Sequence, residues 1–455
     1  MGVSMSNTKG LVRHVKAGPR ALKPGGEHPA AVRTNVGIPV VALLNQDTIH
    51  HVFNTDLVDK EQYCLGYVGV RSELLRGHCP SMFANGQEHR RKKAFLIDVF
   101  RGRQKTLPPV LSRQIMAHFK EWSRLEALAD FEDKVFFLVS DSLTETVFGR
   151  KLDGRLALHW LQGLPSVRTW IPIPTKARQD LAASALPVLL KSIEESPNYE
   201  ELIQLCYLHD IEEEDGIVNI LFTIVFNAVA AVSAVIVTFI TRLHTIIEAD
   251  RNILLKTTLQ ALLKHESLSE ESLGDMKVLD SFLFEVLRLH PPVFNFFGVA
   301  KKDFAIPTGV DKNVEVRQGE QLMGSCFWAQ RDAKVFLSPN VFRCYRFMDS
   351  KELLVDREQD GGKKRHLIFG HGSLTEAADL DSHQCPGQDI AFYLMKATLA
   401  VLLCYCSWEL EALPVWSDKT ARLGRPDDLV SLTWFNFDSD TASHVLESYH
   451  LNCEK

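Results

Sequence analysis

The sequence predicts one large domain that is mainly α-helical and has a minor β portion. Three observations lead to this fold class. Apolar residues recur at helical spacing through most of the 455-residue chain, runs rich in β-branched and aromatic residues are few and short, and no internal repeat is present. The polar stretch at 349–366 has apolar segments on both sides, so we expect a surface loop there and no domain boundary.

Composition and charge describe an ordinary globular protein. The chain has 51 Lys and Arg against 57 Asp and Glu, a formal net charge of −6, and 45% hydrophobic residues. These values exclude a disordered or collagen-like chain, and the mild negative charge argues against a nucleic-acid partner. The nine cysteines include no Cys-x-x-Cys pair, so most are expected to be buried thiols in the reducing cytoplasm.

Residues 1–30 are predicted to form a basic, flexible leader before a domain that spans 31–455. The first 26 residues carry five basic side chains and no acid, and they lack the apolar core of a secretion signal or membrane anchor. They begin Met1-Gly2-x-x-x-Ser6, an N-myristoylation pattern that basic residues can assist; a chance match is the alternative. We expect a cytoplasmic protein without a transmembrane anchor, with peripheral membrane contact if Gly2 is acylated.

Periodicity places the elements along the chain. Amphipathic helices are predicted at 87–100, 131–148, 242–265, 278–290 and 388–406. Short strands are predicted at 37–44, 293–304, 314–316 and 321–327.

The longest uncharged stretch, 217–240, could cross about 30 Å of hydrocarbon, because it has twenty-four residues without Asp, Glu, Lys or Arg. Polar residues are nevertheless scattered through it, and an acidic run at 210–215 precedes it, where acids suit the positive end of a helix dipole. We therefore predict a long helix buried on all sides in the centre of the domain, with a membrane span as the alternative.

A cysteine near the C-terminus stands directly before a predicted helix. A Phe-Gly-His-Gly run at 369–372 is followed by Cys385-Pro386-Gly387, which opens the helix at 388–406. The positive end of a helix dipole favours thiolate, the form that binds metal. Gly387 would let the backbone lie close to a flat cofactor, and Pro386 suits a first helical turn. A small buried hydrophobe is the alternative reading of Cys385.

A second constellation adds weight to this cysteine. Glu285 and Arg288 are spaced i, i+3 on the predicted helix 278–290, and Arg346 follows between aromatic residues. Alone, such a pair would be a solvated surface pair. In this order and at these separations, from about residue 39 onward, the elements resemble the cytochrome P450 superfamily of haem-thiolate enzymes. The resemblance implies haem b between the long central helix and the cysteine loop, Cys385 as proximal ligand, and a buried triad of Glu285, Arg288 and Arg346.

Two departures from the superfamily pattern narrow the reaction, and the first lies in the loop before Cys385. Thirteen positions separate Gly372 from Cys385, where the superfamily has four, so nine residues are inserted. This loop resembles the plant-type fatty-acid hydroperoxide-metabolising clan of allene oxide synthases, hydroperoxide lyases, divinyl ether synthases and epoxyalcohol synthases. Its motif, Gly-x-x-Thr-Glu followed by x-Gln-Cys-x-Gly-x-Asp, is matched at 372–376 and 383–389.

The second departure lies in the central helix, which has no acid between 217 and 240. Oxygen-activating members use an acid and an alcohol there to deliver protons, so ordinary monooxygenation is disfavoured. The run at 226–233 is similar to the clan's Phe-Asn-x-x-Gly-Gly-x pattern, with alanines for the glycines. Asn227 would then hydrogen-bond a peroxide oxygen at the haem; a helix-to-helix hydrogen bond is the alternative.

Buried haem propionates need cationic partners. His89 and Lys93, spaced i, i+4, are similar to the clan's His-x-x-x-Lys motif, and Lys60 falls where the clan has another propionate-binding lysine. Solvated basic residues are the alternative for all three.

The resemblance also implies a substrate pocket. Plant allene oxide synthases have phenylalanine near the position of Cys64 and lyases have leucine, so the pair Cys64 and Leu65 leaves the product branch open. The substrate-facing candidates are Cys64, Leu65, Ser233, Val293, Phe294, Phe296 and Phe297.

The implied activity is the rearrangement of polyunsaturated fatty-acid hydroperoxides by homolytic O–O cleavage, without O₂, NADPH or a reductase. An allene oxide is the first-choice product, with an epoxyalcohol or aldehydes as alternatives. The divergence from plant patterns suggests a non-plant member. A reductase-dependent monooxygenase and a non-catalytic haem-binding protein are the readings from other classes.

Overall fold

The computed structural model describes residues 29–35, 39–61, 73–164, 175–309, 312–348, 369–370, 380, 383–416, 426 and 428–446. The basic leader except residues 29–30, the candidates Cys64 and Leu65, and most of the inserted loop before Cys385 lie outside this part of the chain. The leader boundary and its acylation therefore stay predictions.

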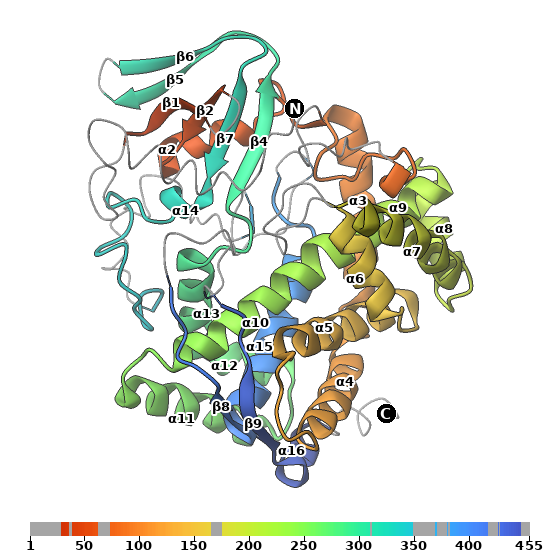
Figure 1. Cartoon of the computed structure of the whole chain (residues 1–455), viewed down its shortest axis with the longest axis vertical. Helices are drawn as coiled ribbons and strands as arrows, with labels where there is room; N and C mark the ends of the chain where they lie inside the picture. Colours follow the sequence, from red (N-terminus) through yellow and green to blue (C-terminus); the bar gives the residue numbers. More distant parts are fainter. Residues whose placement is uncertain are drawn as a thin grey trace.

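Helices fill most of the molecule (Figure 1). A π-helical turn at Thr223–Val229 joins α9 to α10, so that the two form one long rod. The α-helices are α2 Gln46–Ile49, α3 Gly86–Arg103, α4 Leu107–Trp122, α5 Phe131–Phe148, α6 Gly154–Gly163, α7 Lys176–Glu194, α8 Tyr199–Leu208, α9 Glu213–Phe222, α10 Ala230–Leu243, α11 Glu248–His265, α12 Glu270–Asp275, α13 Lys277–Leu289, α14 Cys326–Ala329, α15 Gln388–Tyr405 and α16 Ser439–Leu446.

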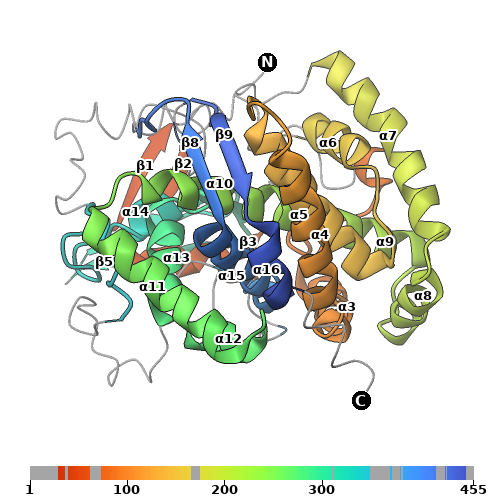
Figure 2. The same ribbon diagram turned by 90° about the horizontal axis from the view of Figure 1, so that it is seen from below.

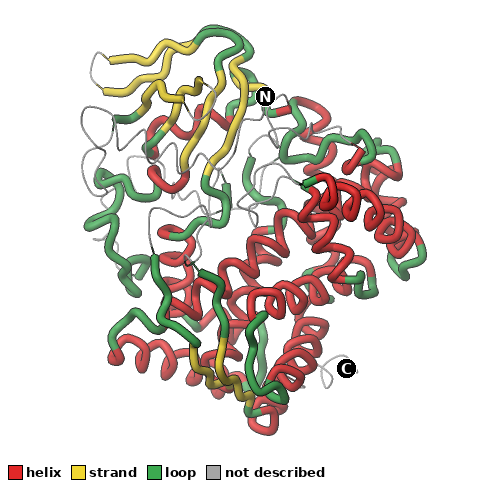
Figure 3. The backbone as a smooth tube through the Cα atoms, viewed as in Figure 1, coloured by secondary structure: helices red, strands yellow, loops and turns green. Residues whose placement is uncertain are grey.

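The β portion gathers mainly at one end of the molecule (Figure 3). A five-stranded sheet has the order β1-β2-β7-β4-β3, in which β2 and β7 are parallel and the other neighbours antiparallel. Two further sheets each consist of one antiparallel pair, β5 with β6 and β8 with β9. The strands are β1 Ala31–Asn35, β2 Pro39–Leu43, β3 Val58–Asp59, β4 Asn295–Ala300, β5 Phe304–Gly309, β6 Lys312–Val316, β7 Gln321–Ser325, β8 Cys406–Leu410 and β9 Leu432–Phe437.

The predicted fold class, mainly α with a minor β portion, is confirmed. Helix α5 begins and ends where periodicity placed it, because Gly149 adopts the left-handed conformation (φ 73°) that commonly ends a helix. The predicted helix 242–265 is wrong at its start, since α10 ends at Leu243 and α11 begins at Glu248. Helix α10 is buried on nearly all sides, whereas α11 buries one narrow row of side chains and leaves the rest of its surface at least partly exposed to solvent. The predicted strand 293–304 is divided between β4 and β5.

The long central rod passes through the middle of the molecule, with helices on both sides in two perpendicular views (Figures 1 and 2). The rod Glu213–Leu243 and helix α15 are both long and apolar enough to span a membrane, but 78% and 67% of their most apolar windows are buried inside the structure. A core position therefore accounts for the uncharged stretch.

Glu285, Arg288 and Arg346 meet in the protein interior, and all three side chains are fully buried. Arg288 donates from Nε and Nη2 to the two carboxylate oxygens of Glu285 at 2.7 and 2.8 Å, and Arg346 Nε donates to both at 3.0 Å. The remaining guanidinium N–H groups donate to main-chain carbonyls, including those of Gln330 and Leu337. One carboxylate thus neutralises two guanidinium groups, and backbone dipoles disperse the surplus charge.

The substitution Glu285→Gln tests this network. It removes the only negative charge among the three and leaves two buried cations, so we expect the free energy of unfolding in urea to fall by about 3–5 kcal/mol. The matched control is Asp180→Asn, which breaks the exposed pair with Lys176 and should leave the urea midpoint unchanged. A Glu285→Gln protein as stable as the control would contradict the role assigned to the network.

Candidate functional site

Helix α3 presents two candidate residues toward the segment that carries Cys385. His89 is 4% exposed and Lys93 is 1% exposed. The helix follows Asn85, whose amide oxygen accepts a hydrogen bond from the N–H of Lys60 at 3.2 Å and whose Nδ2 donates to Asp59 at 2.8 Å. The start of α3 is thereby tied to the segment of Lys60, so residues far apart in sequence share one neighbourhood.

The cysteine segment is held in place by the backbone. The N–H of Cys385 donates to the carbonyl of Phe369 at 2.8 Å. Gly370 adopts φ +86°, and a Cβ there would lie 2.5 Å from the carbonyl oxygen of His383, so only glycine allows this approach. Burial raises the pKa of the Cys385 thiol, while the N–H of Gly387 and the ammonium of Lys93 act to lower it. Lys93 therefore acts on the thiol in the direction that favours thiolate, although burial outweighs it.

Helix α3 approaches the cysteine segment at two places. The rings of His89 and His383 lie 4.4 Å apart between centroids. A Cβ on Gly387 would lie 3.2 Å from the ring of Phe100, so in this structure Gly387 admits an α3 side chain at the position where we expected a flat cofactor. The sequence motif around Cys385 gave no role to His383. The sequence feature that could have indicated one is its position two residues before Cys385.

Lys60 is a buried cation among aromatic rings. Its side chain is 5% exposed, and Nζ lies 4.9 Å from the ring centroid of Phe53 and 5.4 Å from that of Phe296. Burial lowers its pKa to about 8. Within the described residues no carboxylate forms an ion pair with it. Lys60, His89 and Lys93 therefore fit a flat group that carries acidic substituents.

The central rod changes character at its π-turn. Between residues 216 and 241 every residue is buried except five, which are half-buried and fall within or just after the turn: Thr223, Phe226, Asn227, Ala228 and Ala231. Extra-wide π-turns often accompany functional sites in helices. Of these five residues, Phe226, Ala228 and Ala231 have no polar side-chain atom, and Thr223 Oγ1 already donates to the carbonyl of Asn219 at 2.7 Å. Asn227 is therefore the residue on this face whose side chain can donate a hydrogen bond to a ligand. Nothing in the sequence, such as a glycine or proline, indicated the π-turn.

The structure does not bring Ser233 to this accessible face. Ser233 is 1% exposed, and its hydroxyl donates to the carbonyl of Val229 in its own helix at 2.6 Å. A serine that bonds to the preceding turn in this way satisfies itself without a ligand.

The candidates around strand β4 divide between two faces, because side chains alternate along a strand. Phe296 packs at 4.6 Å against Phe53, on the Lys60 side. Phe297 packs in a separate cluster with Val40 and Met323. Before the strand, Phe294 stacks on Phe327, and Val293 is 39% exposed. Of these four, Phe296 is the one in contact with Lys60.

The turn that leads into β4 is anchored by His290, at the end of α13. Arg242 Nε donates to His290 Nε2 at 2.9 Å. Since a guanidinium cannot accept, this Nε2 is unprotonated and the ring is neutral. Burial lowers the pKa of His290 well below its usual value, and the charges of Arg242, Arg331 and Arg288 lower it further.

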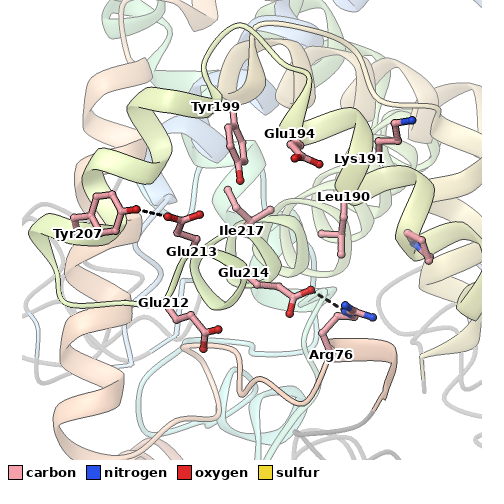
Figure 4. Close-up of a pocket in the computed structure, with 11 residues that line it drawn as sticks. Arg76, Leu190, Lys191, Glu194, Tyr199, Tyr207, Glu212, Glu213, Glu214 and Ile217 are labelled. Atoms are coloured by element: carbon pink, nitrogen blue, oxygen red, sulfur yellow. Dashed lines mark hydrogen bonds and ion pairs between the residues drawn. The ribbon is translucent and has the colours of Figure 1, made fainter.

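A pocket of about 770 Å³ lies elsewhere, at the start of the central rod between α7, α8 and α9. Figure 4 shows two interactions among the residues that line this pocket: Tyr207 donates a hydrogen bond to Glu213, and Arg76 forms an ion pair with Glu214. None of the candidate residues lines this pocket. The chemistry therefore has to be sought where α3, the cysteine segment and Lys60 meet.

Comparison with known proteins places this geometry in context. The family model "Cytochrome P450" matches residues 198–433, just over half of the chain. A divinyl ether synthase of Solanum lycopersicum is 24% identical over 423 residues, 83% of this chain and 82% of that protein. A chloroplastic fatty acid hydroperoxide lyase of the same plant is 27% identical over 80% of this chain and 79% of its own, and allene oxide synthase 1 of Oryza sativa subsp. japonica is 26% identical over 82% and 75%.

Solved structures agree on the fold. The retinoic acid-bound cyanobacterial CYP120A1 has a TM-score of 0.67 at 17% identity and covers 90% of this chain and 92% of its own. A point mutant of cytochrome P450SP alpha has a TM-score of 0.65 at 16% identity, with 90% and 93% covered. The predicted single-domain architecture is confirmed.

The neutral state of His290 predicts a pH dependence of stability. As the pH falls below 6.5, the His290 side chain binds a proton in the unfolded chain but stays neutral in the folded protein. The free energy of unfolding is therefore highest above pH 6.5 and decreases below it, by up to about 1.4 kcal/mol per pH unit. Urea unfolding at pH 7.5 and 5.5 measures the loss. His290→Gln keeps an acceptor for Arg242 and should lose less stability between the two pH values; an equal loss in both proteins would exclude His290 as the cause.

Proposed function

The chain belongs to the cytochrome P450 family, and from that premise we propose that it rearranges polyunsaturated fatty-acid hydroperoxides, with an allene oxide as the first-choice product. The family binds haem through a cysteine thiolate, and we assign that role to Cys385, which stands directly before the first turn of α15. Similarity to divinyl ether synthases, a hydroperoxide lyase and an allene oxide synthase over about four fifths of the chain supports this substrate class.

One observation carries the proposal: the accessible face of the central rod offers an amide and no acid. The half-buried residues at 223–231 include Asn227, and no Asp or Glu stands between 216 and 242. Activation of dioxygen needs protons delivered to the reduced oxygen, and this face has no carboxylic acid to relay them. A hydroperoxide already contains the reduced O–O bond, so neither NADPH nor a reductase is needed.

We assign a separate role in the reaction to each group of candidate residues. Thiolate-bound haem favours O–O cleavage. The Asn227 amide is suited to donate a hydrogen bond to a peroxide oxygen and so orient the O–O bond. Lys60, His89 and Lys93 would hold the acidic edge of the cofactor, and Phe296 beside Lys60 would keep water from the reacting carbon chain.

The product branch depends on the fate of a carbon-centred radical. It would give an allene oxide by losing one electron to the oxidised cofactor and one proton, an epoxyalcohol by regaining the oxygen, or aldehydes by cleavage of the carbon chain. Divinyl ether formation is the second candidate, because several divinyl ether synthases are similar to this chain at 23–24% identity.

The substrate class can be tested by anaerobic mixing of the haem-loaded protein with a linoleate or arachidonate hydroperoxide, without NADPH. We expect rapid loss of the conjugated-diene absorbance, with products identified by mass spectrometry. Cys385→Ala is the control, which should lose both the haem-thiolate spectrum and the reaction. If the absorbance persists with the wild-type protein, a reductase-dependent monooxygenase or a non-catalytic haem protein becomes the better reading.

The role of Asn227 can be tested with Asn227→Leu, which keeps the branched side-chain shape and removes the amide. Loss of the hydrogen bond that orients the peroxide O–O bond should lower kcat roughly tenfold to hundredfold with little change in KM. Ala231→Val, on the same face but without a polar group to lose, is the control for shape alone. Equal losses in the two variants would mean that Asn227 acts through packing.

A further inference from the structure

Two buried hydrogen bonds and one ring contact link the central rod to the cysteine segment. The N–H of Ser81 donates to Asn219 Oδ1 at 2.8 Å, and the carbonyl of Ser81 accepts from His89 Nδ1 at 2.8 Å. The ring of His89 then lies 4.4 Å from that of His383, two residues before Cys385. Asn219, Ser81 and His89 are all at most 5% exposed.

The chemistry of each contact fixes its direction. A main-chain N–H can only donate, so the Asn219 atom that meets Ser81 is the amide oxygen; a carbonyl can only accept, so His89 Nδ1 carries a proton. His89 is thereby held in one tautomer, in which Nε2 carries the lone pair of the neutral ring or the second N–H of the protonated ring.

Asn219 is chemically costly at this position. Its Nδ2 has no hydrogen-bond partner among the described residues, and an unsatisfied buried donor disfavours the folded state. A leucine has the same branched side-chain shape and no donor to leave unsatisfied. The retained amide therefore contributes through its oxygen, which fixes the main chain of Ser81.

We propose that Asn219 is a positioning residue for the cofactor, acting through Ser81 to hold the His89 ring in the tautomer and orientation that suit the acidic edge of haem. The proposal rests on the role given to His89, and it does not depend on which substrate is turned over. Residues one step removed from a binding group typically alter affinity tenfold to hundredfold when replaced, because they orient the group that binds.

The test measures haem dissociation from the holoprotein into an excess of a haem-scavenging apomyoglobin, so that turnover does not enter. Asn219→Leu should speed haem loss about tenfold, whereas Asn219→Asp, which keeps an oxygen acceptor for Ser81, should lose haem more slowly than Asn219→Leu. Thr241→Val is the matched control, since among the described residues the Thr241 hydroxyl bonds within its own helix, and this variant should release haem at the wild-type rate.

A double-mutant cycle with His89→Phe separates positioning from general loosening of the core. If Asn219 acts through His89, Asn219→Leu adds nothing to haem loss in the His89→Phe background. An effect of Asn219→Leu that is the same in both backgrounds, no effect in either, or wild-type haem retention by His89→Phe would overturn the proposal. Each of these outcomes can occur whether or not hydroperoxides are consumed, so it is distinguishable from failure of the proposed function.

Discussion

The carboxylate of Glu285, buried between two guanidinium groups, is the constraint on which the geometry of the site depends. It fixes α13 against the segment that ends in Arg346, and α13 in turn packs against α15, the helix that Cys385 precedes. Asp280 pairs with Lys396 of α15 at 2.5 Å, and Phe284 stacks on Phe392 at 5.0 Å. Because Asp280 and Phe284 lie four residues apart on one face of α13, a shift of this helix would move α15 and the cysteine segment before it.

The helices around the candidate site differ in the charges that they carry. Buried cations come from α3 and from the segment before it, where Lys60 and Lys93 lie, while the facing part of the central rod carries neither acid nor base. A cationic rim suits the acidic edge of a cofactor, and an uncharged rod suits a radical reaction that needs no delivered proton. The same division explains why the rod resembles a membrane span in composition, although it lies in the core.

Sequence reasoning found residues whose chemistry is carried by local pattern. Helix α13 and its Glu285–Arg288 pair follow from i, i+3 spacing, and Cys385 stands out because a helix begins three residues later. It could not find what depends on distant partners. The π-turn has no sequence marker, and Gly387 admits Phe100 from a helix almost three hundred residues earlier. The contact of Asn219 with Ser81 spans 138 residues and satisfies no local rule.

The central claim is that the oxygen in the product comes from the substrate. Turnover of an ¹⁸O₂-labelled fatty-acid hydroperoxide under ¹⁶O₂, with its mirror experiment of unlabelled hydroperoxide under ¹⁸O₂, tests this by mass spectrometry of the freshly formed product. We expect label retained from the hydroperoxide and none taken from dissolved dioxygen. One atom per product from ¹⁸O₂ would contradict the claim and identify a monooxygenase.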